Sequence, residues 1–383
     1  MANRFWIQKN SKSRYFDTLL LLILLLLIVF GLLVIYSVSS YDGYVTYGNS
    51  WYYFKRQLIA SGVGLALMIV VSFVPYHLWI KFRWVVIGFA TLMLLLLIPF
   101  GTTVNGAKRW IYVFGVSIQP AEIAKVAVII ISAYMLVRIG NSVNSFKGIV
   151  YAAIPAAFFA GLVLVITTNL SSAIIVFGIA VIMVFVAGKD YKRYILATLI
   201  LIAGAALYVY IIYSNRDSSL GYRGERVLAW LDPNAYASGK GFQTLQALYA
   251  IGSGGIMGKG IGQSMQKLGY IPEAQNDMIF AIICEELGFV GAICVIAMFL
   301  LLLWRCLIIA YNAPDMFGAF LVIGFMAHIS LQVILNIAVV TNTIPNTGIS
   351  LPFISYGGSA VMCILFEAGL VMSVGRSIKI KET

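Results

Sequence analysis

The stretch LLLLILLLLIVFGLLVI at residues 19–35 decides the fold class, because it contains no charged or strongly polar side chain. A helix needs about 20 mostly apolar residues to cross the roughly 30 Å hydrocarbon layer of a bilayer, and this segment with its flanks is long enough. The rest of the chain is similar, with 61% hydrophobic and only 10% charged residues. This composition excludes a water-soluble globular protein, so the sequence predicts an integral membrane protein.

Apolar segments of spanning length recur along the whole chain. We predict an all-α polytopic membrane protein with about ten transmembrane helices, which form a single integral membrane domain over residues 1–383. One long loop, residues 214–276, separates the seventh span from the eighth. The predicted spans are residues 17–38, 57–75, 84–100, 119–137, 149–167, 170–187, 194–213, 277–304, 316–341 and 351–374.

The distribution of Lys and Arg predicts the orientation, because short cytoplasmic loops carry most of the positive charge. With the N-terminus in the cytoplasm, most Lys and Arg residues near span ends fall on the cytoplasmic side. Both termini are therefore predicted to be cytoplasmic, and the 214–276 loop extracellular. The net charge of +12 follows mainly from this asymmetry, so the basic residues are expected to meet membrane lipids and not nucleic acid. The short loops on the other side hold only Lys55, Arg56, Lys108 and Arg109.

The 214–276 loop is the only long polar segment, and it leads directly to Asp277 at the entrance of the eighth span. Its basic residues include Arg223, Arg226 and Lys259, which could attract an anionic headgroup. Asp277 has two interpretations. It could cap the helix by accepting hydrogen bonds from the first N–H groups, or it could be a catalytic carboxylate, and local sequence favours neither.

The run GSGGIMGKGIGQS at residues 252–264 has bare backbone N–H groups that could approach phosphate oxygens closely. A Walker A loop ending at Lys259 would need Gly in place of Ser253 and Ser or Thr in place of Gly260. A dinucleotide-binding fingerprint would need a preceding strand in a βαβ unit. Both nucleotide sites are excluded, whereas a tightly folded loop and an anion-binding loop both remain open.

A second polar group leads into the fourth span. Lys108 and Arg109 lie in the loop before it, and Pro120 suits the first turn of its helix. Glu122 and Lys125 are three residues apart, so they share a helix face, and burying either charge alone in hydrocarbon would be costly. We predict an interior charged pair, formed between these two residues or across helices. Such a pair could fix helix packing or form a charged wall of a substrate cavity.

Several long motifs follow one another along the chain. They are NGAKRW (105–110), QPAE (119–122), the 223–226 region, PEAQND (272–277), CEELG (284–288) and LPFISYGGS (351–359). Together they resemble the SEDS family (shape, elongation, division and sporulation), whose members include RodA, FtsW and SpoVE, over essentially the whole chain. One segment departs from the family. Many members carry a Gln-Pro-Asp-Leu-Gly-Thr-like stretch before the sixth span, but this chain has TNLSSA at residues 168–173, so no acidic role is carried over there.

The resemblance implies a peptidoglycan glycosyltransferase that polymerises lipid II, an undecaprenyl-pyrophosphate-linked disaccharide peptide. This reaction takes place at the outer face of a bacterial cytoplasmic membrane, usually with a class B penicillin-binding protein. Asp277 would then be the general base that removes a proton from the 4-hydroxyl of the acceptor sugar. No cofactor and no metal ligand is predicted, and a divalent cation requirement stays open. The groups that would bind the substrate and its departing pyrophosphate are Lys108, Arg109, Arg223, Arg226 and Lys259.

Two other classes of function fit parts of the sequence. A lipid-linked precursor transporter, or flippase, would also use interior charges and interrupted helices. It would need access from both faces, however, whereas the polar groups here gather near one face. A division or elongation scaffold that mainly recruits a partner would need no carboxylate at the outer face.

Overall fold

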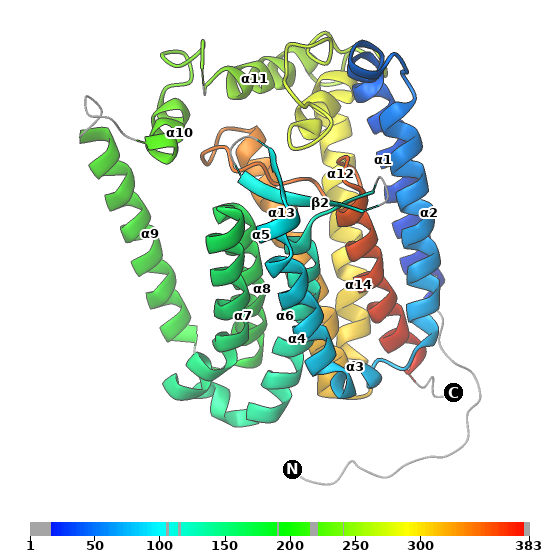
Figure 1. Ribbon diagram of the computed structural model, residues 1–383, viewed down its shortest axis with the longest axis vertical. Helices are drawn as coiled ribbons and strands as arrows, with labels where there is room; N and C mark the ends of the chain where they lie inside the picture. The colour runs from blue at the N-terminus through cyan, green and yellow to red at the C-terminus, as the bar shows by residue number, and fades with distance from the viewer. Residues whose placement is uncertain are drawn as a thin grey trace.

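The structure of the chain, a computed structural model, describes residues 17–104, 107–113, 116–189, 191–214, 221–239 and 241–378. Within these residues, ten helices are long and apolar enough to cross a membrane (Figure 1). The prediction of an all-α, multi-pass membrane protein with about ten spans is confirmed. The helices are α1 (Thr18–Tyr47), α2 (Tyr52–Phe73), α3 (Leu78–Lys81), α4 (Arg83–Leu95), α5 (Leu97–Phe100), α6 (Pro120–Ile139), α7 (Phe146–Thr167), α8 (Leu170–Ala187), α9 (Tyr191–Ser214), α10 (Gly221–Leu231), α11 (Phe242–Gly254), α12 (Ile279–Tyr311), α13 (Met316–Val340) and α14 (Gly358–Arg376), with a 3₁₀ helix at Gly140–Asn144.

The predicted loop between the third and fourth spans forms a small antiparallel sheet. Its strands are β1 (Thr102–Val104), β2 (Ala107–Val113) and β3 (Val116–Ile118), in the order β1-β2-β3. Together with α10, α11 and residues 341–357, this sheet lies at one end of the bundle, which we call the loop face (Figure 1). An ion pair of 2.7 Å between Asp17 and Arg305 joins the start of α1 to the last part of α12 at the other end.

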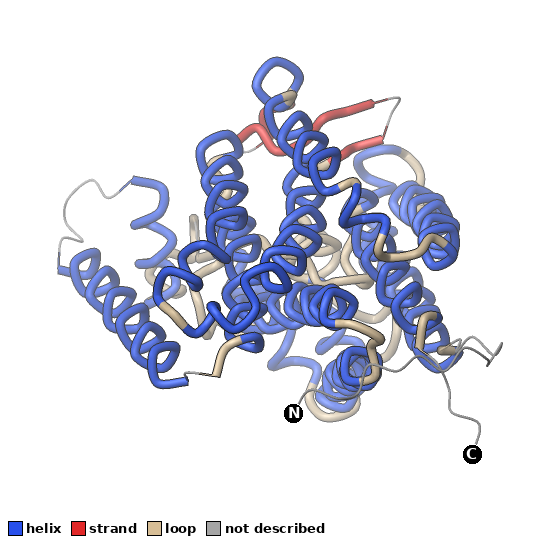
Figure 2. The backbone as a smooth tube through the Cα atoms, turned by 90° about the horizontal axis from the view of Figure 1, so that it is seen from below, coloured by secondary structure: helices blue, strands red, loops and turns tan. Residues whose placement is uncertain are grey.

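The centre of the bundle consists of α6, α13 and α14. In their most apolar segments 61%, 61% and 72% of the residues are buried, whereas in α9 only 6% are. α9 accordingly lies at the edge of the molecule in both views (Figure 1, Figure 2). Small residues let neighbouring helices approach closely. At Gly369 of α14, for example, a Cβ atom would lie 2.8 Å from Met68 O of α2.

α12 is interrupted at Gly288, whose φ of 67° and ψ of −164° are not helical. The loop after α11 packs against this break. A Cβ at Gly288 would lie 2.3 Å from Gly258 N, and a Cβ at Gly258 would lie 2.2 Å from Glu286 O. Glycine is required at both positions, because any side chain would push the loop away from α12. This part of the glycine-rich run is therefore a tightly folded loop.

Glu285 and Glu286 hold the same loop through their side chains, which are 0% and 5% exposed. Lys259 Nζ lies 2.7 Å from Glu285 Oε1, and Lys267 Nζ lies 2.8 Å from Glu286 Oε1. Ser37 of α1 also donates to Glu286 Oε1, at 2.8 Å. The two carboxylates thus join the loop, α12 and α1 into one unit.

Several predicted boundaries differ from the structure: α2 begins at Tyr52 and not at residue 57, and α12 continues past residue 304 to Tyr311. α1 continues past residue 38 to Tyr47 and ends at Gly48, which adopts a left-handed conformation. The last helix begins at Gly358 and not at residue 351. Residues 341–357 form no helix before it, and they contain two prolines that interrupt backbone hydrogen bonding.

Candidate active site

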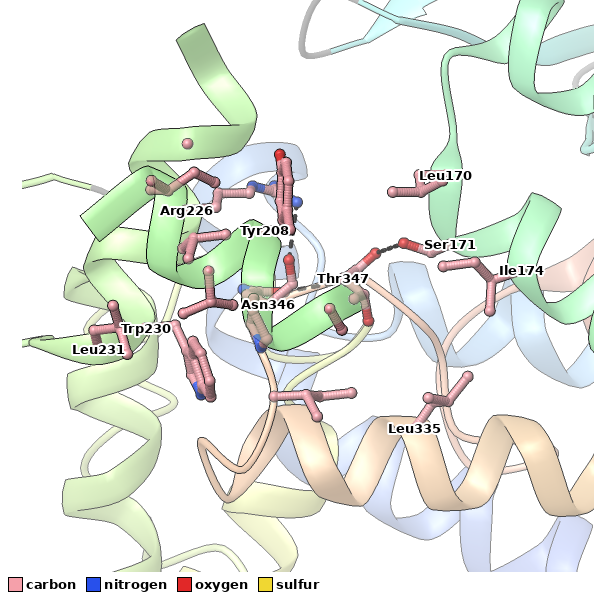
Figure 3. A pocket seen from close by; sticks show the side chains of 18 of the residues that line it. Leu170, Ser171, Ile174, Tyr208, Arg226, Trp230, Leu231, Leu335, Asn346 and Thr347 are labelled. Carbon is pink, nitrogen blue, oxygen red and sulfur yellow. Dashed lines mark hydrogen bonds between the residues drawn. The ribbon is translucent and has the colours of Figure 1, made fainter. Parts of the chain in front are cut away.

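A large cavity lies beside α9 and α10 at the loop face, with a volume of about 1790 Å³ (Figure 3). Its walls come from α9, α10, the start of α8 and residues 343–349. The wall from α9 is largely apolar and includes Ile202, Ala205 and Val209. Among the described residues that line the cavity, the charged ones are Arg109 and Arg226. The cavity therefore combines an apolar side with a cationic side.

α10 is held in place by its apolar face and by a tryptophan. Val227 and Leu228 pack with Ile212 of α9 in a small buried cluster. Trp230 donates from Nε1 to Asn342 O at 3.0 Å, and Asn342 donates from Nδ2 to Trp230 O at 3.3 Å. This double connection fixes α10 on the segment that follows α13.

The loop before α14 forms another part of the cavity wall. Arg226 donates from Nη1 to Asn346 O at 3.0 Å (Figure 3), and Asn346 donates from Nδ2 to Gln243 Oε1 of α11 at 2.9 Å. Ser171 of α8 donates to Thr347 O at 2.7 Å. Contacts from α8, α10 and α11 thus fix the backbone of this wall, so the cavity has a defined shape.

The segment in which the chain departs from the SEDS pattern also lines the cavity. Thr168, Asn169, Leu170 and Ser171 all belong to its wall. Asn169 accepts a hydrogen bond at Oδ1 from the N–H of Ser172 at 3.1 Å, which caps α8. The segment thus presents hydroxyl and amide groups to the cavity where a carboxylate would be expected from the family pattern.

Asp277 is half-buried and is not itself one of the residues that line this cavity. Met278 occupies the cap position of α12 and makes no side-chain cap bond, so Asp277 does not cap that helix. Asn336 donates from Nδ2 to Asp277 O at 2.8 Å and to Ile349 O at 2.7 Å. A Cβ at Gly348, which lines the cavity, would lie 3.7 Å from Asp277 Oδ2. The carboxylate therefore lies beside the cavity wall.

Burial raises the pKa of Asp277 from 3.8 to about 6. The nearby charge of Glu273 raises the pKa further, while a backbone N–H and the charge of Arg226 lower it. Asp277 forms no ion pair with any residue that the structure describes. With a pKa of about 6, roughly nine-tenths of this carboxyl group is ionised at pH 7. A carboxylate of this kind can accept a proton near neutral pH.

The structure brings two of the predicted substrate-binding residues to this site. Arg109 of β2 and Arg226 of α10 both line the cavity, although 117 residues separate them in the sequence. Arg226 also interacts electrostatically with Asp277. Arg223 belongs to α10 as well, and its side chain lies outside what the structure describes.

Two other predicted substrate-binding residues lie elsewhere. Lys108 donates from Nζ to Ile98 O at 2.9 Å and does not line the cavity. Lys259 is paired with Glu285, as described above, and also lies outside the cavity wall. In this conformation both ammonium groups have partners within the chain.

Glu122 and Lys125, which the sequence analysis predicts as an interior charged pair, lie next to each other in the structure. Lys125 Nζ lies 2.7 Å from Glu122 Oε1, and the side chains are 1% and 5% exposed. Beside them, His328 Nδ1 of α13 lies 2.8 Å from Glu367 Oε2 of α14, and both of these residues are fully buried. Both residues of the first pair interact electrostatically with both residues of the second. The pair therefore belongs to a four-residue cluster that joins α6, α13 and α14, away from the cavity wall.

Sequence reasoning overlooked Asn336, which holds the backbone of Asp277. A signal was present, because His328, Gln332 and Asn336 recur every four residues and thus lie on one face of α13. All three side chains are buried. Polar residues repeated on one face of an apolar span mark the side that faces the protein interior.

These features define a class: a multi-pass membrane protein whose loop face holds a partly apolar cavity, two arginines and a titratable carboxylate. A family model described as a cell cycle protein, for FtsW, RodA and SpoVE, matches residues 17–380. Stage V sporulation protein E of Bacillus subtilis (strain 168) is 38% identical over 362 residues, which cover 94% of this chain and 97% of that protein. The chain belongs to the FtsW, RodA and SpoVE family, as its motifs indicate.

Other relatives agree with this assignment. A probable peptidoglycan glycosyltransferase FtsW of Geobacter metallireducens is 37% identical over 368 residues, covering 95% of this chain and 96% of that protein. A chain in a solved peptidoglycan synthase complex, described as coordinating polymerization and crosslinking, has a TM-score of 0.77 and 25% identity and covers 95% of this chain and 98% of its own length. The rod shape determining protein RodA of Thermus thermophilus shares the fold, with a TM-score of 0.67, 24% identity and coverage of 96% and 98%.

Proposed function

We propose that this chain polymerises lipid II into glycan strands at the outer face of the bacterial cytoplasmic membrane, with Asp277 as the general base. The family membership and the near-full-length similarity to FtsW relatives make it a peptidoglycan glycosyltransferase. The observation that carries the residue assignment is the half-buried carboxylate of Asp277, whose pKa is raised to about 6, beside a cavity lined by two arginines.

The cavity suits a lipid-linked pyrophosphate because its two sides differ in chemistry. The apolar wall from α9, with Ile202 and Val209, matches a polyprenyl chain. The guanidinium groups of Arg109 and Arg226 can make charge-assisted hydrogen bonds to phosphate oxygens. α9 buries little of its surface, so lipid can approach this side of the cavity from the bilayer.

The reaction needs a base on one side of the anomeric carbon and cations on the other. Asp277 accepts the proton of the acceptor 4-hydroxyl as its oxygen forms the new glycosidic bond. The bond between the donor's anomeric carbon and the pyrophosphate breaks, and the pyrophosphate leaves with the electron pair. Arg109 and Arg226 stabilise the negative charge that develops on it. Asn336 positions the base, because it binds the backbone carbonyl of Asp277.

The proposal includes an orientation and a partner. The loop face lies outside the cell, and both termini lie in the cytoplasm, since Lys and Arg are concentrated in the short loops of the other side. A class B penicillin-binding protein is the proposed partner. A structural relative in a peptidoglycan synthase complex supports it.

The test is glycan synthesis by the purified chain in nanodiscs supplied with lipid II, with and without a class B penicillin-binding protein. We expect glycan strands from the parent chain and almost none from Asp277→Asn. Glu225→Gln is the matched control, because Glu225 is an exposed acidic residue of α10 outside the cavity wall. Full activity of Asp277→Asn would remove the proposed base, and an inactive parent chain under all conditions would remove the proposed reaction.

A further inference from the structure

The loop between α11 and α12 exposes large apolar side chains at residues 256–265, which we call the loop tip. Ile256, Met257, Ile261 and Met265 are 69%, 78%, 74% and 56% exposed. The position of the loop in the sequence, within a long polar segment, predicts a water-facing surface. Four large apolar side chains on one short stretch are unusual for such a surface and mark a contact with protein or membrane.

The loop tip cannot easily turn these side chains inward, because its backbone is bound to α12. The N–H of Gly260 donates to Glu286 O at 2.9 Å, and the N–H of Val290 donates to Ile256 O at 3.1 Å. The ion pair between Lys259 and Glu285 adds a side-chain connection. The apolar side chains are therefore presented outward by a fixed scaffold.

The level of the loop tip relative to the bilayer follows from α12. After the break at Gly288, the helix continues from Phe289 to Tyr311. At 1.5 Å per residue this part is about 33 Å long. That length matches a hydrocarbon layer of roughly 30 Å. Phe289 then lies at the edge of the hydrocarbon layer, and its N–H donates to Gly255 O at 2.9 Å, next to the loop tip.

α1 gives the same level independently. Lys267, just after the loop tip, donates from Nζ to Ser37 of α1 at 3.1 Å. Ser37 lies 19 residues after Thr18, the first residue of α1, which corresponds to about 28 Å along the helix. Two helices that cross the membrane therefore place the loop tip at the boundary between hydrocarbon and headgroups.

The surface next to the loop tip indicates what covers it. Phe289, Val290 and Ile293 are 63%, 44% and 49% exposed on the spanning part of α12, where a membrane protein meets lipid chains. Val290 is hydrogen-bonded to Ile256, so the apolar surface of the loop tip continues the lipid-facing surface of the span. Gly269, just after the loop tip, lies near the ring of Tyr41 of α1, which is exposed. Exposed tyrosines are expected in the aromatic belt at a membrane interface.

We infer that the loop tip is immersed in the headgroup–acyl boundary of the leaflet on the loop face, so that lipid covers Ile256, Met257 and Ile261. The bilayer then holds the 256–265 segment against α12. Through Glu285 and Glu286 it steadies the segment that leads to Asp277. This inference does not depend on the reaction catalysed, and its test uses no substrate.

The test compares single cysteines in nanodiscs that contain the chain alone. Met257→Cys and Ile261→Cys report on the loop tip, and Ser238→Cys is the control in an exposed turn of the same long loop. The background carries Cys294→Ala, because Cys294 is an exposed native cysteine. We expect a membrane-impermeant maleimide to label residues 257 and 261 about tenfold more slowly than residue 238, as for side chains buried at the interface.

A second measurement shows whether lipid or protein covers the loop tip. An environment-sensitive fluorophore is attached at each position, and phosphatidylcholine–phosphatidylglycerol nanodiscs are made with or without brominated acyl chains. We expect bromine to quench the fluorophores at residues 257 and 261 and leave the one at 238 unchanged. Equal labelling rates at all three positions would overturn the inference, and so would slow labelling without quenching, which would mean that the chain itself covers the loop tip.

Discussion

Asp277 and the pair Glu285–Glu286 lie within ten residues of one another, yet their carboxylates have opposite surroundings. Glu285 and Glu286 are buried, and each is paired with a lysine at 2.7–2.8 Å. Glu285 also accepts hydrogen bonds from Ser264 and from the N–H of Met265. Asp277 is half-buried beside a large cavity and has no ion pair with any described residue.

The difference is the one expected between a structural carboxylate and the proposed general base. The lone pairs of Glu285 and Glu286 are occupied by cations and donors, so a proton transferred to either would break existing bonds. Asp277 holds its position through its backbone, which Asn336 binds, and its side chain remains available beside the cavity wall. Available lone pairs and a pKa near 6 are what a general base requires.

The largest expected effect comes from Asp277→Asn. General base catalysis contributes about 10²–10⁴-fold, so we expect glycan synthesis to fall by roughly 10³-fold. The thermal midpoint should not fall below that of the parent, because asparagine keeps the backbone contact with Asn336 and no ion pair with a described residue is lost. Turnover and thermal unfolding measured on the same preparation check this. A large drop in the midpoint would place Asp277 with the structural carboxylates.

Removing one member of the Glu122–Lys125 pair should give the largest loss of stability. Leaving a buried charge without its partner costs about 3–5 kcal/mol. We therefore expect Lys125→Met and Glu122→Gln each to lower the thermal midpoint and the yield of folded protein, and to lower activity in proportion to the folded fraction. Unchanged midpoints in both variants would contradict the structural role of this pair.

A smaller loss of stability is expected for Glu285→Gln. Glutamine keeps some hydrogen bonds to Ser264 and the loop backbone but leaves the partly exposed Lys259 without its counter-ion, at a cost of about 2–3 kcal/mol. The specific activity of the folded fraction should remain within about threefold of the parent. Activity lost without any change in the midpoint would make Glu285 a reactive group and reverse the comparison with Asp277.

The fold could be predicted from the sequence because each span is long, apolar and separated from its neighbours by polar residues. The interior pair could be predicted too, since Glu122 and Lys125 interact within one helix and a membrane forbids isolated charges. Local sequence determines both features. The small sheet and the starting residue of α14 were not predicted, because strand pairing and loop packing depend on contacts between distant segments.

The site could be predicted only in part for the same reason. Charge alone does not distinguish Arg226, which lines the cavity, from Lys259, which binds Glu285. Lys259 differs from Arg226 because the break at Gly288 lets the glycine-rich loop pack against α12. The lysines of this loop then form ion pairs with Glu285 and Glu286. Asn336 was overlooked because its role is a contact with the backbone of a segment 59 residues away.

The affinity for lipid II should distinguish Arg226, which lines the cavity, from Lys108, which does not. Arg226→Gln keeps a donor for Asn346 O but removes the charge, so we expect lipid II to bind about tenfold more weakly, the loss of one charge-assisted contact. Lys108→Gln is the matched control, because Lys108 lies at the loop face outside the cavity wall. Dissociation constants measured in nanodiscs decide the matter. Equally weakened binding of lipid II in both variants would mean that affinity depends only on the overall positive charge of the loop face. The cavity would then not be the binding site.

The dependence on pH should give the smallest effect, about twofold at pH 6. A general base acts only when deprotonated, so kcat/KM should fall to about half of its plateau at pH 6 and to about one tenth at pH 5.

The contribution of Asp277 to the stability of the fold changes with pH in the opposite direction to activity. Its pKa is raised in the folded state, so the folded chain binds the proton more tightly, and this stabilisation is present below pH 3.8 and is lost as the pH rises through about 6.

The difference in thermal midpoint between the parent and Asp277→Asn isolates this one group from all other titrations. We expect the parent to lose stability relative to the variant between pH 5 and pH 7, while its activity rises over the same interval. Glu285 should show no such coupling, because its carboxylate is already bound by Lys259 and Ser264 throughout this range. An activity profile that is flat down to pH 4.5, or a constant difference in midpoint, would mean that the surroundings of Asp277 do not set its proton affinity. The contrast between Asp277 and the paired glutamates would then rest on ion pairing alone.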